Sequence, residues 1–186
     1  MKNLGQAMIL AAMMGGCSAA PEVREYDIGG GGARPASLAE LASGARGAGG
    51  FVLRGTVASV APAMDELVVD RPTAELNVAY PMVEATISVT DAMGSAIGAT
   101  AIVLGGDGDP QIVDDDGIPS SEWVVSGTGS TDSEHVWMPS TGEHVFFVVP
   151  RGEGHQLMWV TGVVDGVVAG DGTADGVDVP IAELAL

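Results

Sequence analysis

The sequence predicts a mainly β protein, a small antiparallel β-barrel or sandwich preceded by one short helix, after a signal peptide and a flexible tether. Valine-rich segments recur from residue 51 onward, which is typical of strands. Hydrophobic residues make up 46% of the chain but aromatic residues only 4%, so the core must be mostly aliphatic. The 28 glycines and 10 prolines among 186 residues indicate that many turns separate these strands.

The first element is a targeting segment, predicted over residues 1–16. Lys2 supplies a positive charge, and an apolar stretch, AMILAAMM, follows over residues 7–14. Eight apolar residues are too few for a membrane-spanning helix, which needs about 20 to cross a hydrocarbon core of ~30 Å. The segment is therefore interpreted as an export signal rather than as a transmembrane anchor.

The chain has a single cysteine, and its setting is informative. Met14-Gly15-Gly16-Cys17 resembles the lipobox of bacterial lipoproteins, although Met14 stands where that family usually has leucine. The resemblance implies cleavage before Cys17, acylation of its thiol and of the new amino terminus, and anchoring to the cell membrane or the outer membrane. Ser18 in the second mature position favours the outer membrane. The alternative is an ordinary secretory signal cleaved near residues 19–20, with Cys17 discarded.

A flexible tether is predicted over residues 17–35, because this stretch contains four consecutive glycines at 29–32 and prolines at 21 and 35. One domain is predicted over 36–186. It begins with a helix, since Ser37 and Glu40 fit a capping box and Leu38, Leu41 and Ala42 share one face. Glycines 44 and 47 are expected to end this helix early.

Strands follow the helix. Residues 81–92 alternate cleanly, with Val83, Ala85, Ile87 and Val89 on one side, which predicts a half-buried antiparallel strand. Further strands are predicted by their β-branched content and by the glycine, proline and aspartate clusters between them, over residues 51–60, 100–104, 122–126, 143–149, 156–164 and 177–181.

The order of these segments resembles a widespread exported bacterial OB-like β-barrel domain. The segments that carry the resemblance are SLAEL, FVLRGTVASV, VEATISVTDAMGSAIGATAIVLGG and TGEHVFFVVPRGEGHQLMWVTG, so it covers about residues 37–165. It implies a fold and no catalytic residues. Relative to that pattern, the acidic loop predicted over residues 105–142 is long.

The net charge of the chain limits the kinds of molecule that it is expected to bind. The chain has 7 basic and 25 acidic residues and a net charge of −18, and its only lysine is Lys2. Such a surface repels phosphate backbones and anionic headgroups, so nucleic-acid binding is not expected.

Calcium is the one cofactor that the acidic segments suggest, because Ca²⁺ takes six to eight oxygen ligands. Neither acidic segment matches a standard site: aligned on Gly117, an EF-hand loop would place Ile112 first and Trp123 last. The segment from Asp171 comes closer, but Ala182 stands where the bidentate glutamate is required. Solvated turns and an irregular calcium site are the two interpretations. The residues concerned are Asp107, Asp109, Asp114, Asp115, Asp116, Asp171, Asp175 and Asp178.

Catalysis has little support in the sequence, and no catalytic residue is predicted. The three histidines, His135, His144 and His155, could form a zinc set with Glu134 or Glu143, but their spacing matches no known motif. There is no G-x-S-x-G motif, and carboxylate pairs are too numerous to single one out. A hydrolase with a carboxylate or a histidine–metal site is the third functional hypothesis.

The favoured hypothesis is a lipid-anchored envelope protein that acts as a binding or interaction module without catalytic activity. Its expected partners are the membrane, through the lipid on Cys17, and another envelope protein. The contact surface is predicted where apolar residues interrupt the loop over 105–142, at Trp123, Trp137 and Met138. The alternative is that these residues only pack the loop onto the barrel. The second hypothesis is a calcium-binding envelope protein.

Overall fold

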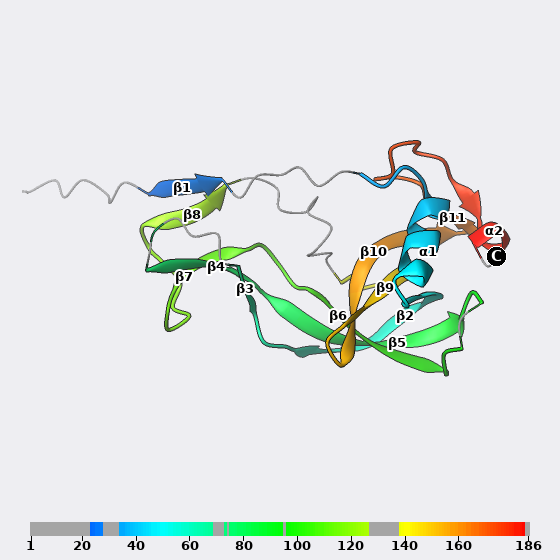
Figure 1. Ribbon diagram of the computed structural model, residues 1–186, viewed down its shortest axis with the longest axis horizontal. Helices are drawn as coiled ribbons and strands as arrows, with labels where there is room; N and C mark the ends of the chain where they lie inside the picture. Colours follow the sequence, from blue (N-terminus) through cyan, green and yellow to red (C-terminus); the bar gives the residue numbers. More distant parts are fainter. Residues whose placement is uncertain are drawn as a thin grey trace, which may run out of the picture.

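In the computed structural model, the described part of the protein is mainly β, as the sequence predicts, and its largest sheet curls around a core (Figure 1). The structure describes residues 23–27, 34–68, 73, 75–94, 96–126 and 138–184. The main sheet has seven strands in the order β12-β11-β10-β6-β5-β2-β9, with an additional pairing of β10 with β9. Their bounds are β2 (Phe51–Pro62), β5 (Met82–Asp91), β6 (Thr100–Gly106), β9 (His144–Arg151), β10 (Gly154–Val164), β11 (Val167–Val168) and β12 (Val179–Pro180).

The additional pairing closes β2, β5, β6, β10 and β9 into a ring, so the barrel is closed. Consecutive members of the ring pair antiparallel except β10 with β6, which meet in parallel at Gln156 and Leu104. A small closed barrel is one of the two architectures that the sequence predicts, but the contact between β10 and β6 departs from the predicted antiparallel pairing.

Helix α1 (Leu38–Gly47) precedes the barrel and begins at the predicted cap. The Ser37 hydroxyl accepts a hydrogen bond from the Glu40 N–H at 3.2 Å, while the Glu40 carboxylate accepts one from the Ala36 N–H at 2.6 Å. These two bonds satisfy backbone donors that the first helical turn leaves without a partner. The helix continues through Gly44 and ends at Gly47.

Two apolar clusters lie on opposite faces of the barrel wall, because side chains alternate along each strand. One fills the barrel interior and includes Leu53, Ile87 and Phe146. The other lies outside the barrel and includes Val52 and Phe147, which pack with Leu41 and Ala45 of α1. Adjacent residues of β9 thus belong to different clusters. Helix α2 (Ile181–Leu184) adds Leu184 to the outer cluster.

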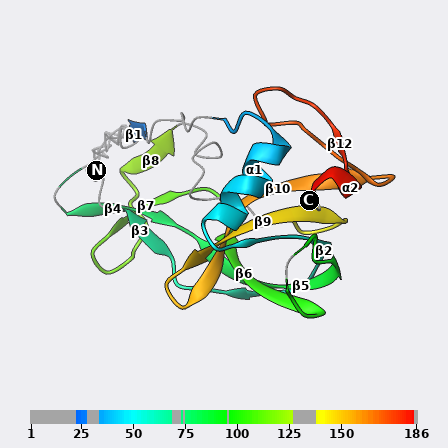
Figure 2. The same cartoon turned by 45° about the vertical axis from the view of Figure 1, so that its right-hand side comes forward.

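Beyond the barrel, the chain forms an arm. Its three-stranded sheet, ordered β3-β4-β7, comprises β3 (Glu66–Val68), β4 (Leu76–Tyr80) and β7 (Gln111–Asp114). Strand β4 runs directly into β5 across Pro81, and β7 follows β6, so the barrel strands continue into the arm (Figures 1 and 2). Two more strands, β1 (Arg24–Asp27) and β8 (Trp123–Ser126), pair in parallel beside this sheet and complete the arm.

The arm changes two expectations from the sequence. Residues 24–27 belong to the stretch predicted as a flexible tether, but they form β1 and pair with residues 123–126 of β8. The segment predicted as a long acidic loop, 105–142, contains β7, which was not expected, whereas the strand predicted over 122–126 is confirmed as β8. A third apolar cluster, including Val78, Tyr80 and Ile112, joins these strands, with Tyr26 and Trp123 packed against it. Residues 24–27 are therefore fixed to the arm.

Candidate functional site

An apolar groove of about 260 Å³ lies in the arm between β7 and β8. Its apolar lining consists of Pro110, Ile112, Pro119, Trp123, Val124 and Val125. Residues 117–120 fold back along β7: the Ser120 N–H donates to the Ile112 carbonyl at 2.8 Å, and the Asp114 N–H donates to the Ile118 carbonyl at 3.0 Å. This return brings Pro119 opposite Val113 and places it in the wall of the groove.

Trp123 is the one predicted contact residue that the structure places in this groove. Its side chain is half-buried, and the guanidinium carbon of Arg24 lies 5.5 Å from its ring centroid. A cation over an indole face at this distance is attracted by the ring quadrupole. The parallel pairing of β1 with β8 places Arg24 directly beside Trp123, so β1 helps to hold the indole in position.

Of the two other predicted contact residues, the structure describes Met138, which does not join Trp123. Met138 packs against the cluster in the barrel interior, and its N–H donates to the Gly106 carbonyl at 3.0 Å. Trp137 lies outside the described residues, as does Cys17. The sequence does not predict that Arg24 and Pro119 lie at the groove. For Arg24, the one indication is that two charged residues are flanked by apolar ones over residues 23–26, a stretch that falls within the predicted tether.

The aspartates of the first acidic segment lie around the groove and shape its turns. One Asp114 carboxylate oxygen accepts hydrogen bonds from the N–H groups of Asp116 and Ile118, at 3.0 and 2.8 Å. Asp115 accepts one from the Asn77 side-chain amide at 3.1 Å. Asp107 and Asp109 are exposed, as are Asp115 and Asp116. The role of Asp114 is that of a turn-forming aspartate, which bonds to backbone N–H groups near in sequence.

The aspartates of the C-terminal segment form a separate turn that contacts residues 35 and 36, just before α1. Asp175 accepts from the Thr173 hydroxyl at 2.8 Å, and Asp178 accepts from the Gly170 N–H at 2.9 Å. Asp171 is exposed. Within the part of the chain that the structure describes, no group of three or more His, Cys, Asp or Glu side chains is arranged to hold a metal ion. Calcium binding stays a prediction.

The histidines that the structure describes lie against aromatic rings of the barrel. The His155 ring centroid is 4.8 Å from that of Phe51, and the His144 ring is 6.1 Å from that of Phe146. His135 and Glu134 lie outside the described residues. Glu143, the other predicted partner for zinc, is instead paired with Arg54 at 2.6 Å. The positions of these side chains add no support to the hydrolase hypothesis.

The Arg54–Glu143 pair lies next to the outer cluster and makes stability depend on pH. The hydrogen bond from Arg54, aided by the positive charge, lowers the pKa of Glu143 below its usual 4.5. A lowered carboxyl pKa stabilises the folded state at pH values above the unfolded pKa, and this contribution is lost as the pH falls through the folded pKa.

We therefore expect Glu143→Gln to reduce the free energy of unfolding by about 0.5–1 kcal/mol at neutral pH, because the pair is partly exposed. Below about pH 4 the difference between the variant and the wild type should shrink, since Glu143 becomes protonated in the unfolded and then in the folded state. Urea unfolding of both proteins from pH 7 to pH 3 measures this. A difference that stays constant over that range would contradict the assignment.

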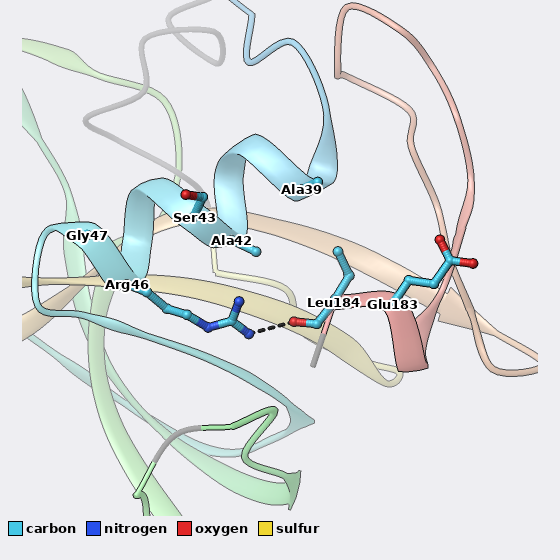
Figure 3. Close-up of a pocket in the computed structure, with 7 residues that line it drawn as sticks. All are labelled: Ala39, Ala42, Ser43, Arg46, Gly47, Glu183 and Leu184. Carbon is cyan, nitrogen blue, oxygen red and sulfur yellow. Dashed lines mark hydrogen bonds between the residues drawn. The ribbon is translucent and has the colours of Figure 1, made fainter. Parts of the chain in front are cut away.

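A second groove, of about 590 Å³, separates α1 from α2 (Figure 3). Arg46 extends across it and donates to the Leu184 carbonyl at 2.5 Å and to the Met93 carbonyl at 2.9 Å. Small side chains of α1, Ala39, Ala42 and Ser43, form the facing wall. The guanidinium thus joins α1, the turn after β5 and α2, which makes this groove a structural junction.

Neither α1 nor α2, the helices within the described residues, is long and apolar enough to cross a membrane. No protein-family model matches the chain, and no curated protein and no solved structure is significantly similar to it.

Proposed function

We propose that this protein is a lipid-anchored, non-catalytic binding module of the bacterial envelope, and that its arm groove binds an extended, basic segment of another envelope protein. The observation that carries the proposal is an apolar groove lined by Trp123, with exposed carboxylates next in the chain to its lining residues. The lipid anchor is supported by the resemblance of Met14-Gly15-Gly16-Cys17 to a lipobox.

The size of the groove favours side chains of a protein over a small molecule. Pockets for drug-sized ligands span about 300–1,000 Å³ and enclose most of the ligand. The arm groove, at about 260 Å³, is smaller and open to solvent, and it can hold one or two aliphatic side chains. Tryptophan is also among the residue types enriched in the few interface positions that contribute most of the binding energy.

The charge around the groove favours a basic partner. Asp109 and Glu122 directly precede the lining residues Pro110 and Trp123, and the turn at Asp115 and Asp116 adds two exposed carboxylates. Opposite charges across an interface accelerate encounter and disfavour wrong partners, and they matter more for specificity than for affinity. A segment in which Lys or Arg alternates with Val or Leu meets both requirements, because alternate side chains of an extended chain point to opposite sides.

Val124→Lys tests this assignment, because Val124 lines the groove and its side chain is 46% exposed, so the change should not disturb folding. The probe is a synthetic peptide of alternating arginine and leucine, titrated calorimetrically into the full chain. We expect Val124→Lys to weaken binding at least tenfold, which is about 1.4 kcal/mol, through repulsion and loss of the apolar contact.

The matched control is Val164→Lys, at the end of β10, where the valine is 70% exposed. Both variants change the net charge equally, so a loss confined to Val124→Lys identifies the groove. An equal loss of peptide affinity in the two variants would show that the peptide binds only through the overall negative charge of the protein. Photo-crosslinking from position 124 in intact envelopes, with position 164 as the control, then identifies the natural partner and the basic content of its contacted segment.

A further inference from the structure

We infer that the arm faces the lipid surface when the protein is anchored, and that the barrel is held on the side of the arm away from the bilayer. The inference rests on the proposed lipid on Cys17 and deepens the proposed function, because it specifies where the groove meets its partner. It follows from the position of β1, which the structure assigns to the arm rather than to a free tether.

Strand β1 is attached to the arm by several contacts. Four residue pairs join it to β8, from Arg24 with Trp123 to Asp27 with Ser126. The Arg24 N–H donates to the Glu122 carbonyl at 2.8 Å, and Tyr26 packs against the arm's apolar cluster. Backbone, cation–π and apolar contacts therefore act on the same four residues.

Because β1 is attached to the arm, only a short length of chain can separate the arm from the lipidated residue. Seven residue steps separate Cys17 from Arg24, so even a fully extended chain spans at most about 25 Å from the lipidated residue to β1. A tether that stayed free as far as Pro35 would have eighteen steps and a reach of about 65 Å, and either end of the molecule could then approach the bilayer.

The position of β1 in the arm determines which end of the molecule lies nearer to the bilayer. The arm and the helices α1 and α2 lie at opposite ends of the long axis of the molecule (Figures 1 and 2). Strand β1 points toward the barrel in Figure 1, so Arg24 is at the outer end of the strand. The chain that leads to the lipid therefore leaves from the outer end of the arm.

The charge of the arm does not reverse this arrangement. Exposed carboxylates such as Asp109 and Asp116 are repelled by anionic headgroups, but screening limits that repulsion to about 8 Å at physiological ionic strength. The chain from Cys17 to β1, which can extend to about 25 Å, is long enough to allow such a gap. The arm is thus expected to stand slightly off the headgroups, with its groove accessible to a basic segment that lies next to the membrane.

Energy transfer to a labelled bilayer tests the orientation. The full-length protein, purified with its lipid, is placed in vesicles of 80% phosphatidylcholine and 20% phosphatidylglycerol that carry an acceptor dye on the headgroups. A donor dye is attached to one introduced cysteine, at Asp116→Cys in the arm or at Asp171→Cys in the turn that contacts the residues just before α1. Both positions are exposed, and both changes remove one carboxylate. We expect clearly higher transfer from position 116 than from position 171.

A pair of insertions isolates the role of β1. Six added residues between Ala20 and Pro21 lengthen the chain before β1 and should lower the transfer from position 116. The same six residues between Gly30 and Gly31 lie after β1 and should leave it unchanged.

The outcomes separate the two proposals. Mass spectrometry of the purified protein and the distribution of Cys17→Ser between membrane and soluble fractions report on the anchor itself. A chain without lipid on Cys17 would overturn the anchor and, with it, the orientation. A lipidated chain with equal or higher transfer from position 171, or with equal effects of the two insertions, would overturn the orientation alone.

Discussion

Replacing Gly55 by alanine is expected to destabilise the barrel by about 3 kcal/mol, at the upper end of the range for overpacking. Gly55 lies in β2 between β5 and β9, beside a register shift in the pairing with β5. A β-carbon there would lie 2.2 Å from the Ser88 carbonyl oxygen. The obstacle is backbone, so two strands would have to separate to relieve the clash.

The matched control for this prediction is Gly162→Ala. Gly162 lies in β10 of the same barrel, and a β-carbon there meets nothing within 4 Å. Chemical denaturation followed by tryptophan fluorescence should give a much smaller change for Gly162→Ala. Equal free energies of unfolding for the two variants would show that the close approach of β2 to β5 does not limit the barrel.

Phe146→Ala is expected to cost about 3–5 kcal/mol, because it removes one of the largest fully buried side chains of the barrel interior and leaves a cavity. The interior has few aromatic residues with which to refill that space. The measurement is the free energy of unfolding from denaturant titration, together with amide exchange of the individual strands.

The neighbouring variant, Phe147→Ala, gives the comparison that makes this prediction specific. Phe147 is equally buried but packs with α1 outside the barrel. We expect its loss to accelerate exchange first in α1 and α2, by local opening, while Phe146→Ala accelerates exchange in all barrel strands. Identical exchange patterns in the two variants would contradict the division into an inner and an outer cluster.

The barrel could be predicted from the sequence because its signals are local. Alternation over residues 81–92 was correct: Val83, Ala85 and Ile87 are buried, whereas Glu84 and Ser88 are exposed. The helix start was correct because capping depends on Ser37 and Glu40 alone. Such patterns need no knowledge of which strand pairs with which.

Most of the arm could not be predicted, although the strand expected over 122–126 is confirmed as β8, because its other strands are short and depend on distant partners. Strand β4, with the sequence LNVAY, includes a buried Asn77, and β7 is only four residues long. Strand β1 gains its structure from β8, about a hundred residues later in the chain. Trp123 could be recognised as a contact residue by its type, but the groove around it exists only after that pairing.

The continuity of the barrel strands with the arm limits how this protein can vary. Tyr80 and Met82 lie on either side of Pro81 and belong to the same apolar cluster, so the alternation of faces passes through the junction. Adding or removing one residue in β4 alone would exchange the faces of the arm relative to the barrel, whereas matched changes of two residues in β4 and its neighbours would preserve them. The arm can therefore lengthen or shorten in evolution, or by engineering, in steps of two residues per strand, which would set the distance between groove and barrel without altering either core.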